Sequence, residues 1–264
     1  MYMRVSAEIQ TSVDLSATDV AALVMAAVLV TNVVWRLRRN HLNSAGLLRA
    51  NMAMAVVVIL SISSVFAFID PLIGGDSLLN CLSHFFMIYA GWQVTIAMAQ
   101  FLQPFDGLKR QPLLIRAWVP VVAAIGTLSS FLILNPGSSR GLDAYDHRPA
   151  FVMYWASTLL PLILGAFHLL PRMVKLAPMV LGAKKLTAIS MSLLWLSLVG
   201  VLLSTIFYGL SAINESLWVA REIVVTLTTL AFAVGFLLAT AALPRATGRT
   251  IRRQRQEEIQ AAPQ

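Results

Sequence analysis

The sequence predicts an all-α protein, a polytopic bundle of seven transmembrane helices with its N-terminus outside the cell and its C-terminus in the cytoplasm. Three observations indicate this fold class. Hydrophobic residues make up 58% of the 264 residues and charged residues 12%, about half the charged share of an ordinary soluble domain. The charges gather into short clusters that separate apolar runs of roughly 18 to 25 residues, long enough to cross a bilayer. Basic residues concentrate in alternate loops, as in proteins that cross a membrane repeatedly.

The seven runs are expected to be helices, because they are apolar on all sides and longer than the alternating strands of a membrane barrel. Within them, formal charges occur only at Asp19, at the edge of the first run, and at Arg221 and Glu222, near the start of the seventh. The expected spans are 18–35, 50–69, 77–102, 117–134, 149–170, 186–210 and 217–243.

No linker, repeat or low-complexity segment divides these runs. They are therefore expected to form one transmembrane domain, 18–243. An extracellular N-terminal segment, 1–17, would precede this domain, and a basic cytoplasmic tail, 244–264, would follow it.

The first run could be mistaken for a signal peptide, which has a basic flank before its apolar stretch and a small-residue cleavage site after it. Here the order of the charges is reversed. Glu8 and Asp14 precede the run, whereas Arg36, Arg38 and Arg39 follow it. The first run is therefore expected to stay in place as a helix, with its N-terminus exported.

The orientation follows from the distribution of the 20 lysines and arginines. Sixteen of them lie in the segments expected on one side of the membrane, which are 36–49, 103–116, 171–185 and the tail. Because basic residues near a span resist translocation, this side is expected to be cytoplasmic. The sequence thus predicts a multi-pass protein of the plasma membrane.

The net charge of +8 would suggest a nucleic-acid partner in a soluble protein. Here the positive charge lies along the membrane surface, where anionic lipid headgroups are the expected partners. The tail could form a short basic helix on the inner leaflet, or it could be a disordered positive anchor. The residues expected at the lipid surface are Arg249, Arg252, Arg253 and Arg255.

Polar residues at membrane depth indicate where a site could lie, since each needs a partner or water. Counting along the helices from their outer ends places six such residues at a similar depth. Together they could line a pocket open to the outside, in which Arg221 holds an anionic group and Glu222 or His84 exchanges a proton. The six candidate ligand-binding residues are Asn80, His84, Tyr154, Tyr208, Arg221 and Glu222.

A structural role for the same residues stays open. Arg221 and Glu222 could lie among the lipid headgroups, and the tyrosines could belong to the aromatic belt at the interface. His84 could be hydrogen-bonded in the core of the bundle.

Two further features bear on helix packing. Pro120 and Pro161 fall inside expected spans, where each removes a backbone donor and can kink its helix. Ala231, Gly235 and Ala239 form a stripe of small residues in the last span. Such a stripe permits close approach of another helix, either within the bundle or, as the alternative, in a dimer.

The sequence contains no recognisable catalytic or cofactor motif. One cysteine, Cys81, excludes an internal disulfide and a paired-cysteine motif. The four histidines are too far apart in the predicted topology for a zinc site. The lysines all lie in cytoplasmic loops, so the last span lacks the lysine that a retinal Schiff base needs. No metal, no cofactor and no enzymatic activity are expected.

Three features carry a resemblance to known proteins: the exported N-terminus, the basic stretch Arg36 to Arg39, and His84 after the leucine-rich start Leu78 to Ser83. In these features the chain resembles a family of actinobacterial seven-span membrane proteins catalogued as candidate transporters of unknown function. The resemblance implies a bacterial membrane protein, and His84 is the one residue that it carries over.

The sequence therefore favours a non-enzymatic bundle that moves or binds a small solute from the outside. The alternative is a seven-span sensor or docking protein, which couples an external signal or lipid to a cytoplasmic protein partner. An intramembrane enzyme that acts on lipid is the third and weakest interpretation.

Overall fold

The computed structural model describes residues 17–38, 45–106, 118–136, 142, 148–181 and 185–242. Within these residues the chain is helical and contains no β-strand, which confirms the expected all-α class. The N-terminal segment up to residue 16 and the basic tail lie outside the described residues. The same holds for the four arginines expected at the lipid surface, Arg249, Arg252, Arg253 and Arg255.

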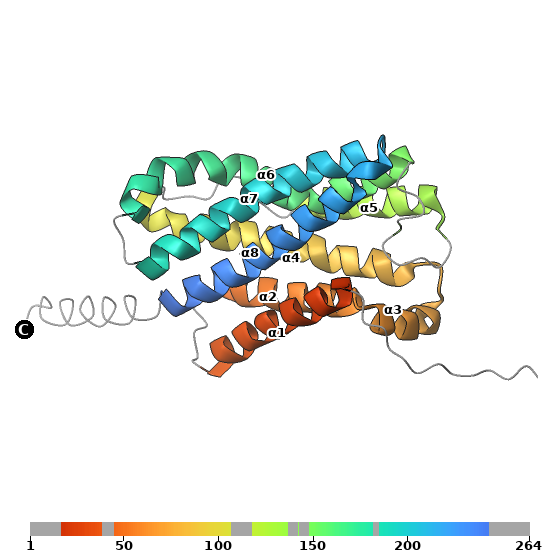
Figure 1. Cartoon of the computed structure of the whole chain (residues 1–264), viewed down its shortest axis with the longest axis horizontal. Coiled ribbons are helices and arrows are strands. Elements are labelled where there is room, and N and C mark those ends of the chain that lie inside the picture. The colour runs from red at the N-terminus through yellow and green to blue at the C-terminus, as the bar shows by residue number, and fades with distance from the viewer. Residues whose placement is uncertain are drawn as a thin grey trace, which may run out of the picture.

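The long helices run lengthwise and lie side by side (Figure 1). The N-terminus of α1 and the turn between α7 and α8 lie at the same end of the bundle as the short helix α3, and we call this the α3 end. The C-termini of α1, α4, α6 and α8 lie at the opposite end. The helices are α1 (Ala17–Arg38), α2 (Ala45–Leu60), α3 (Ser63–Ile69), α4 (Leu78–Asp106), α5 (Trp118–Leu134), α6 (Pro149–Leu181), α7 (Lys185–Ser211) and α8 (Trp218–Ala242), with short 3-10 turns at Asp70–Ile73 and Glu215–Leu217.

Five of the described helices, α1, α4, α6, α7 and α8, are long and apolar enough to cross a membrane. A sixth span is present if the bent pair of α2 and α3 counts as one. Helix α5 is apolar but has 17 residues, about 26 Å at 1.5 Å per residue, against a hydrocarbon core of about 30 Å. The chain thus has the helices of a membrane protein, with five to six candidate spans where the sequence predicts seven.

The expected second span, 50–69, is not one straight helix. Helix α2 ends at Leu60, and the chain from Ser63 onward is bent by 84° from its direction. The backbone N–H and the hydroxyl of Ser63 both donate to the carboxylate of Asp19 on α1, each at 2.9 Å. This contact satisfies a backbone donor that the start of a helix leaves open. A partner from another helix therefore stabilises the break, which falls at Ser61 and Ser63 within a mostly apolar run.

The expected cytoplasmic segment 171–185 is helical for most of its length, because α6 continues to Leu181. Pro161, Pro171 and Pro178 all lie inside this helix. Pro120, by contrast, is the third residue of α5, a position whose N–H would lack an intrahelical partner in any case.

Small residues bring α7 and α8 close together. A methyl group added at Gly200 would lie 3.1 Å from Cβ of Thr228 and would overlap its hydroxyl oxygen. The Ser190 hydroxyl donates to the Gly235 carbonyl at 3.0 Å, and Leu194 packs directly against Gly235. The small-residue stripe of α8 therefore packs against α7 within the chain.

The polar face of α4 packs against α6 in a similar way. A methyl group added at Gly91 would lie 2.8 Å from Leu162 Cγ. The Thr95 hydroxyl donates to the carbonyl of Gly91 at 2.9 Å and is 3.2 Å from that of Pro161 on α6. The Thr95 hydroxyl therefore joins α4 to the backbone carbonyl of Pro161 on α6.

Candidate functional site

The six candidate residues come from four helices that meet at the α3 end (Figure 1). Asn80 and His84 lie in the first two turns of α4, and Tyr154 lies in the second turn of α6. Tyr208 lies in the last turn of α7. Arg221 and Glu222 are the fourth and fifth residues of α8. Counting depth from the helix ends thus placed these residues at one level, and the structure brings them together.

A line of rings in contact connects these helices. His84 lies between two side chains of α6, with ring centroids 4.7 Å from Tyr154 and 4.6 Å from Trp155. Trp155 stacks on Tyr208 at 4.4 Å with an interplanar angle of 19°. The guanidinium carbon of Arg221 lies 5.0 Å from the Tyr208 ring centroid. We call these five side chains, Tyr154, His84, Trp155, Tyr208 and Arg221, the aromatic column.

Arg221 lies inside the bundle and not on its rim, since only 1% of its side chain is exposed. Its Nε and Nη2 donate to Glu222 Oε1 at 3.3 and 3.2 Å. Its Nη1 lies 3.4 Å from the Ser211 hydroxyl. The rings of Phe151 and Trp218 flank the guanidinium carbon, each with its centroid at 5.9 Å. A buried cation needs such partners, because it has lost its hydration.

The other member of this ion pair is more accessible. The Glu222 side chain is 38% exposed, although its Oε1 accepts both hydrogen bonds from its neighbour. The pair therefore joins a buried cation to a carboxylate that reaches the surface of the bundle.

His84 has a defined tautomer in this arrangement. Its Nδ1 lies 2.6 Å from the Asn80 carbonyl oxygen. Because a carbonyl only accepts, Nδ1 carries the proton, and Nε2 of the neutral ring is left as an acceptor. That Nε2 atom is buried and has no hydrogen-bond partner.

Two neighbours of His84 in the column share this property. The Tyr154 hydroxyl and the Trp155 Nε1–H are also buried without a hydrogen-bond partner. Buried polar groups are normally paired, because an unpaired one costs about 1 to 3 kcal/mol. Three unpaired groups on touching side chains therefore mark a place where a polar molecule would be stabilised.

The column supplies binding groups and not an evident catalytic set. It offers a cation at Arg221, a donor at Trp155, an acceptor at His84 and a hydroxyl at Tyr154. Among the described residues, no three His, Cys, Asp or Glu side chains gather as metal ligands. The ring contacts of 4.4 to 4.7 Å close the column in this structure, so a solute would have to part the rings.

Sequence reasoning missed Trp155, Phe151, Trp218 and Ser211, which complete the surroundings of His84 and Arg221. In an apolar span, an aromatic side chain is indistinguishable from one that faces lipid. A signal did exist: Tyr154 and Trp155 follow Phe151 by three and four residues, so all three side chains lie on one face of α6.

Comparison with protein-family models, with curated proteins and with solved structures finds no match to this chain. Function must therefore be inferred from the geometry of the aromatic column.

Proposed function

We propose that this chain is a seven-span protein of the bacterial plasma membrane that binds a small anionic solute at the aromatic column and carries it across the bilayer. In this proposal the solute enters from outside, no reaction is catalysed and no cofactor is required. The observation that carries the proposal is the set of three unpaired buried polar groups, on His84, Tyr154 and Trp155, in the same column as the buried cation Arg221, which Tyr208 connects to Trp155.

The seventh span and the orientation are part of the proposal. Helix α5 would be the seventh span, tilted little or matched by a locally thinner bilayer. Described basic residues such as Arg38, Arg49 and Lys185 belong to helix ends opposite the α3 end. With those ends in the cytoplasm, the positive-inside rule is satisfied, and the column lies near the outer face of the membrane. The resemblance to the actinobacterial seven-span family agrees with this arrangement.

The ion pair at the column favours an anion as the solute. Glu222 Oε1 already occupies one side of the guanidinium of Arg221. Since this carboxylate is 38% exposed, it can turn toward water and leave its place to the carboxylate or phosphate of a solute. Arginine binds such groups through two parallel hydrogen bonds.

A thermal-unfolding screen of the purified protein tests the proposal. Each probe carries an anionic group for Arg221 and a hydroxyl that can donate to His84 Nε2: glycolate, 4-hydroxybenzoate and inorganic phosphate, with 4-hydroxybenzamide as a neutral match to 4-hydroxybenzoate. At least one anion should raise the midpoint of unfolding, because a ligand that binds only the folded state stabilises it. His84→Ala and Arg221→Ala should remove the shift, whereas Arg49→Ala, far from the column, should keep it.

Flux in proteoliposomes then separates transport from sensing. Gradient-dependent uptake of the stabilising anion supports a transporter. Binding without flux would favour the sensor or docking protein instead. If no anion stabilises the wild type, or if both column variants behave like the wild type, the column is a structural feature and the proposed site does not exist.

A further inference from the structure

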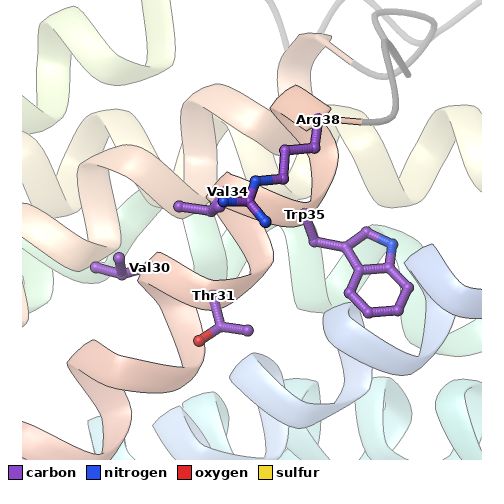
Figure 2. Close-up of a pocket in the computed structure, with 5 residues that line it drawn as sticks. All are labelled: Val30, Thr31, Val34, Trp35 and Arg38. Carbon is purple, nitrogen blue, oxygen red and sulfur yellow. The ribbon is translucent and has the colours of Figure 1, made fainter.

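A groove of about 350 Å³ lies on the surface of α1. It is in the C-terminal half of the helix, which points away from the α3 end where the aromatic column lies (Figure 1). Figure 2 shows the side chains that line it, which follow one face of the helix toward its C-terminal end. The valines and the indole ring make most of this surface apolar. The groove is lined by Val30, Thr31, Val34, Trp35 and Arg38.

Among the five described helices that are long enough to cross a membrane, α1 has the smallest buried share. Within its candidate span 28% of the residues are buried, against 50% in that of α4. Val30, Val34 and Trp35 are each 40 to 44% exposed. In a membrane, a surface of this kind is covered by an acyl chain or by another apolar helix.

Arg38 gives the groove a charged end. Its side chain extends back along the helix toward Val34 in Figure 2. It is exposed and makes no hydrogen bond or ion pair with the part of the chain that the structure describes. Arg36, on the opposite face, is buried at 3% exposure, and its Nε lies 3.4 Å from Asn32 Oδ1. Of the two arginines that the structure describes at this helix end, Arg38 is therefore the one that faces outward.

We infer that this groove is a binding site for an anionic phospholipid, with an acyl chain along Val30 and Val34 and the phosphate at Arg38. The sequence around the groove favours an anionic lipid over a zwitterionic one. From residue 20 to residue 69 the chain has four arginines and no acidic residue, so neither α1 nor α2 offers a partner to the ammonium of a zwitterionic headgroup. A tryptophan such as Trp35 is typical of the level where chains meet headgroups.

This site does not depend on the proposed function, because it uses neither the aromatic column nor transport. The site also defines the depth of α1 in the bilayer. With a phosphate at Arg38, the C-terminal end of α1 lies at the headgroup region of one leaflet.

Native mass spectrometry of the delipidated full-length protein tests the inference. The probe is an equimolar mixture of phosphatidylglycerol and phosphatidylcholine. The wild type should retain phosphatidylglycerol preferentially. Arg38→Gln should lower the bound fraction about fivefold, the equivalent of about 1 kcal/mol for one arginine at a membrane surface.

Matched variants show whether the groove itself is responsible for the lipid binding. Arg49→Gln removes the same charge at the same end of the bundle, on an exposed residue outside the groove, and should change binding less than twofold. Val34→Trp fills the groove and should lower binding as Arg38→Gln does. Val24→Trp, at a 53% exposed position outside the groove, should not.

Several outcomes would overturn the inference. Equal losses in Arg38→Gln and Arg49→Gln would mean that surface charge alone attracts the lipid. Equal retention of the two lipids would remove the anionic preference. If Val34→Trp bound as much lipid as the wild type, the acyl chain would have to lie outside the groove. If the wild type were a dimer that Val34→Trp dissociates, a second copy of the protein would cover the groove.

Discussion

Two arginines show how differently the two ends of the bundle accommodate a positive charge. Arg221, at the α3 end, is 1% exposed and is held by Glu222, Ser211 and the Tyr208 ring. Arg38, at the other end, is exposed on an apolar groove and has no partner among the described residues. A cation inside the bundle must bring its counter-ion from the chain. A cation at the surface of the bundle can instead pair with an anionic lipid headgroup.

The packing around the two arginines differs in the same way. The column belongs to a large apolar core built mainly from α4, α5, α6, α7 and α8. Helices α1 and α2 form a second, smaller core with a contribution from α8. Changes at the column should therefore affect the stability of the whole bundle, and changes at α1 should have local effects.

The largest expected effect on stability is that of Arg221→Ala. It should lower the free energy of unfolding by roughly 2 to 4 kcal/mol, because it removes a fully buried side chain and the partner of Glu222. The matched change Arg38→Ala should cost less than about 0.5 kcal/mol. Denaturant unfolding in detergent, followed by tryptophan fluorescence, measures both. Similar losses in the two variants would contradict the contrast between the two ends.

Gly200→Ala tests how tightly the larger core is packed. The added methyl group would overlap the Thr228 hydroxyl across the α7–α8 interface, and overpacking of this kind costs about 1 to 3 kcal/mol. Gly209→Ala, on the same helix but with no atom within 4 Å of the new methyl group, is the control. It should leave stability unchanged or raise it by up to about 1 kcal/mol. The same unfolding assay measures both variants. If Gly200→Ala were as stable as Gly209→Ala or more stable, the α7–α8 interface would not be tightly packed at Gly200.

Asp19→Ala probes the smaller core. Loss of the hydrogen bonds to Ser63 should cost about 1 kcal/mol, the usual value for removing a helix cap. The effect should stay local, so that amide hydrogen exchange accelerates in α3 and not in α7 or α8. Faster exchange throughout the bundle would mean that the two cores unfold together.

His84→Met should change stability only slightly, although His84 lies in the aromatic column. The change loses the bond to the Asn80 carbonyl, but it also removes an unpaired buried nitrogen, and each of these terms is about 1 kcal/mol. The free energy of unfolding should therefore stay within about 1 kcal/mol of the wild type. Anion binding should nevertheless be lost, which a thermal-shift titration would detect. A variant that binds normally would remove His84 from the site.

Much of the fold could be predicted, because each apolar run corresponds to helical residues in the structure. The run 50–69 was the exception in shape. The run is mostly apolar, but three serines, Ser61, Ser63 and Ser64, lie at the break after Leu60 and were a local signal for it. The bond from Ser63 to Asp19, 44 residues away in sequence, could not be predicted in the same way.

The level of the site along the helices could be predicted as well, since 1.5 Å per residue converts a sequence position into a depth. Which side chains face one another could not. The spans are apolar all round, so nothing in the sequence fixes their rotation. The stacking of Trp155 on Tyr208 became visible only once α6 and α7 were placed side by side.

The anionic nature of the solute is tested most directly by the affinity of Glu222→Gln for the stabilising anion. This variant removes the carboxylate that competes for Arg221 but keeps an oxygen that can accept from it. Affinity should rise roughly tenfold, equivalent to about 1.4 kcal/mol. Asp76→Asn, an exposed acid at the same end of the bundle, should leave it nearly unchanged. An unchanged or weaker affinity in Glu222→Gln, or an equal rise in both variants, would contradict the assignment of Arg221 as the anion-binding group.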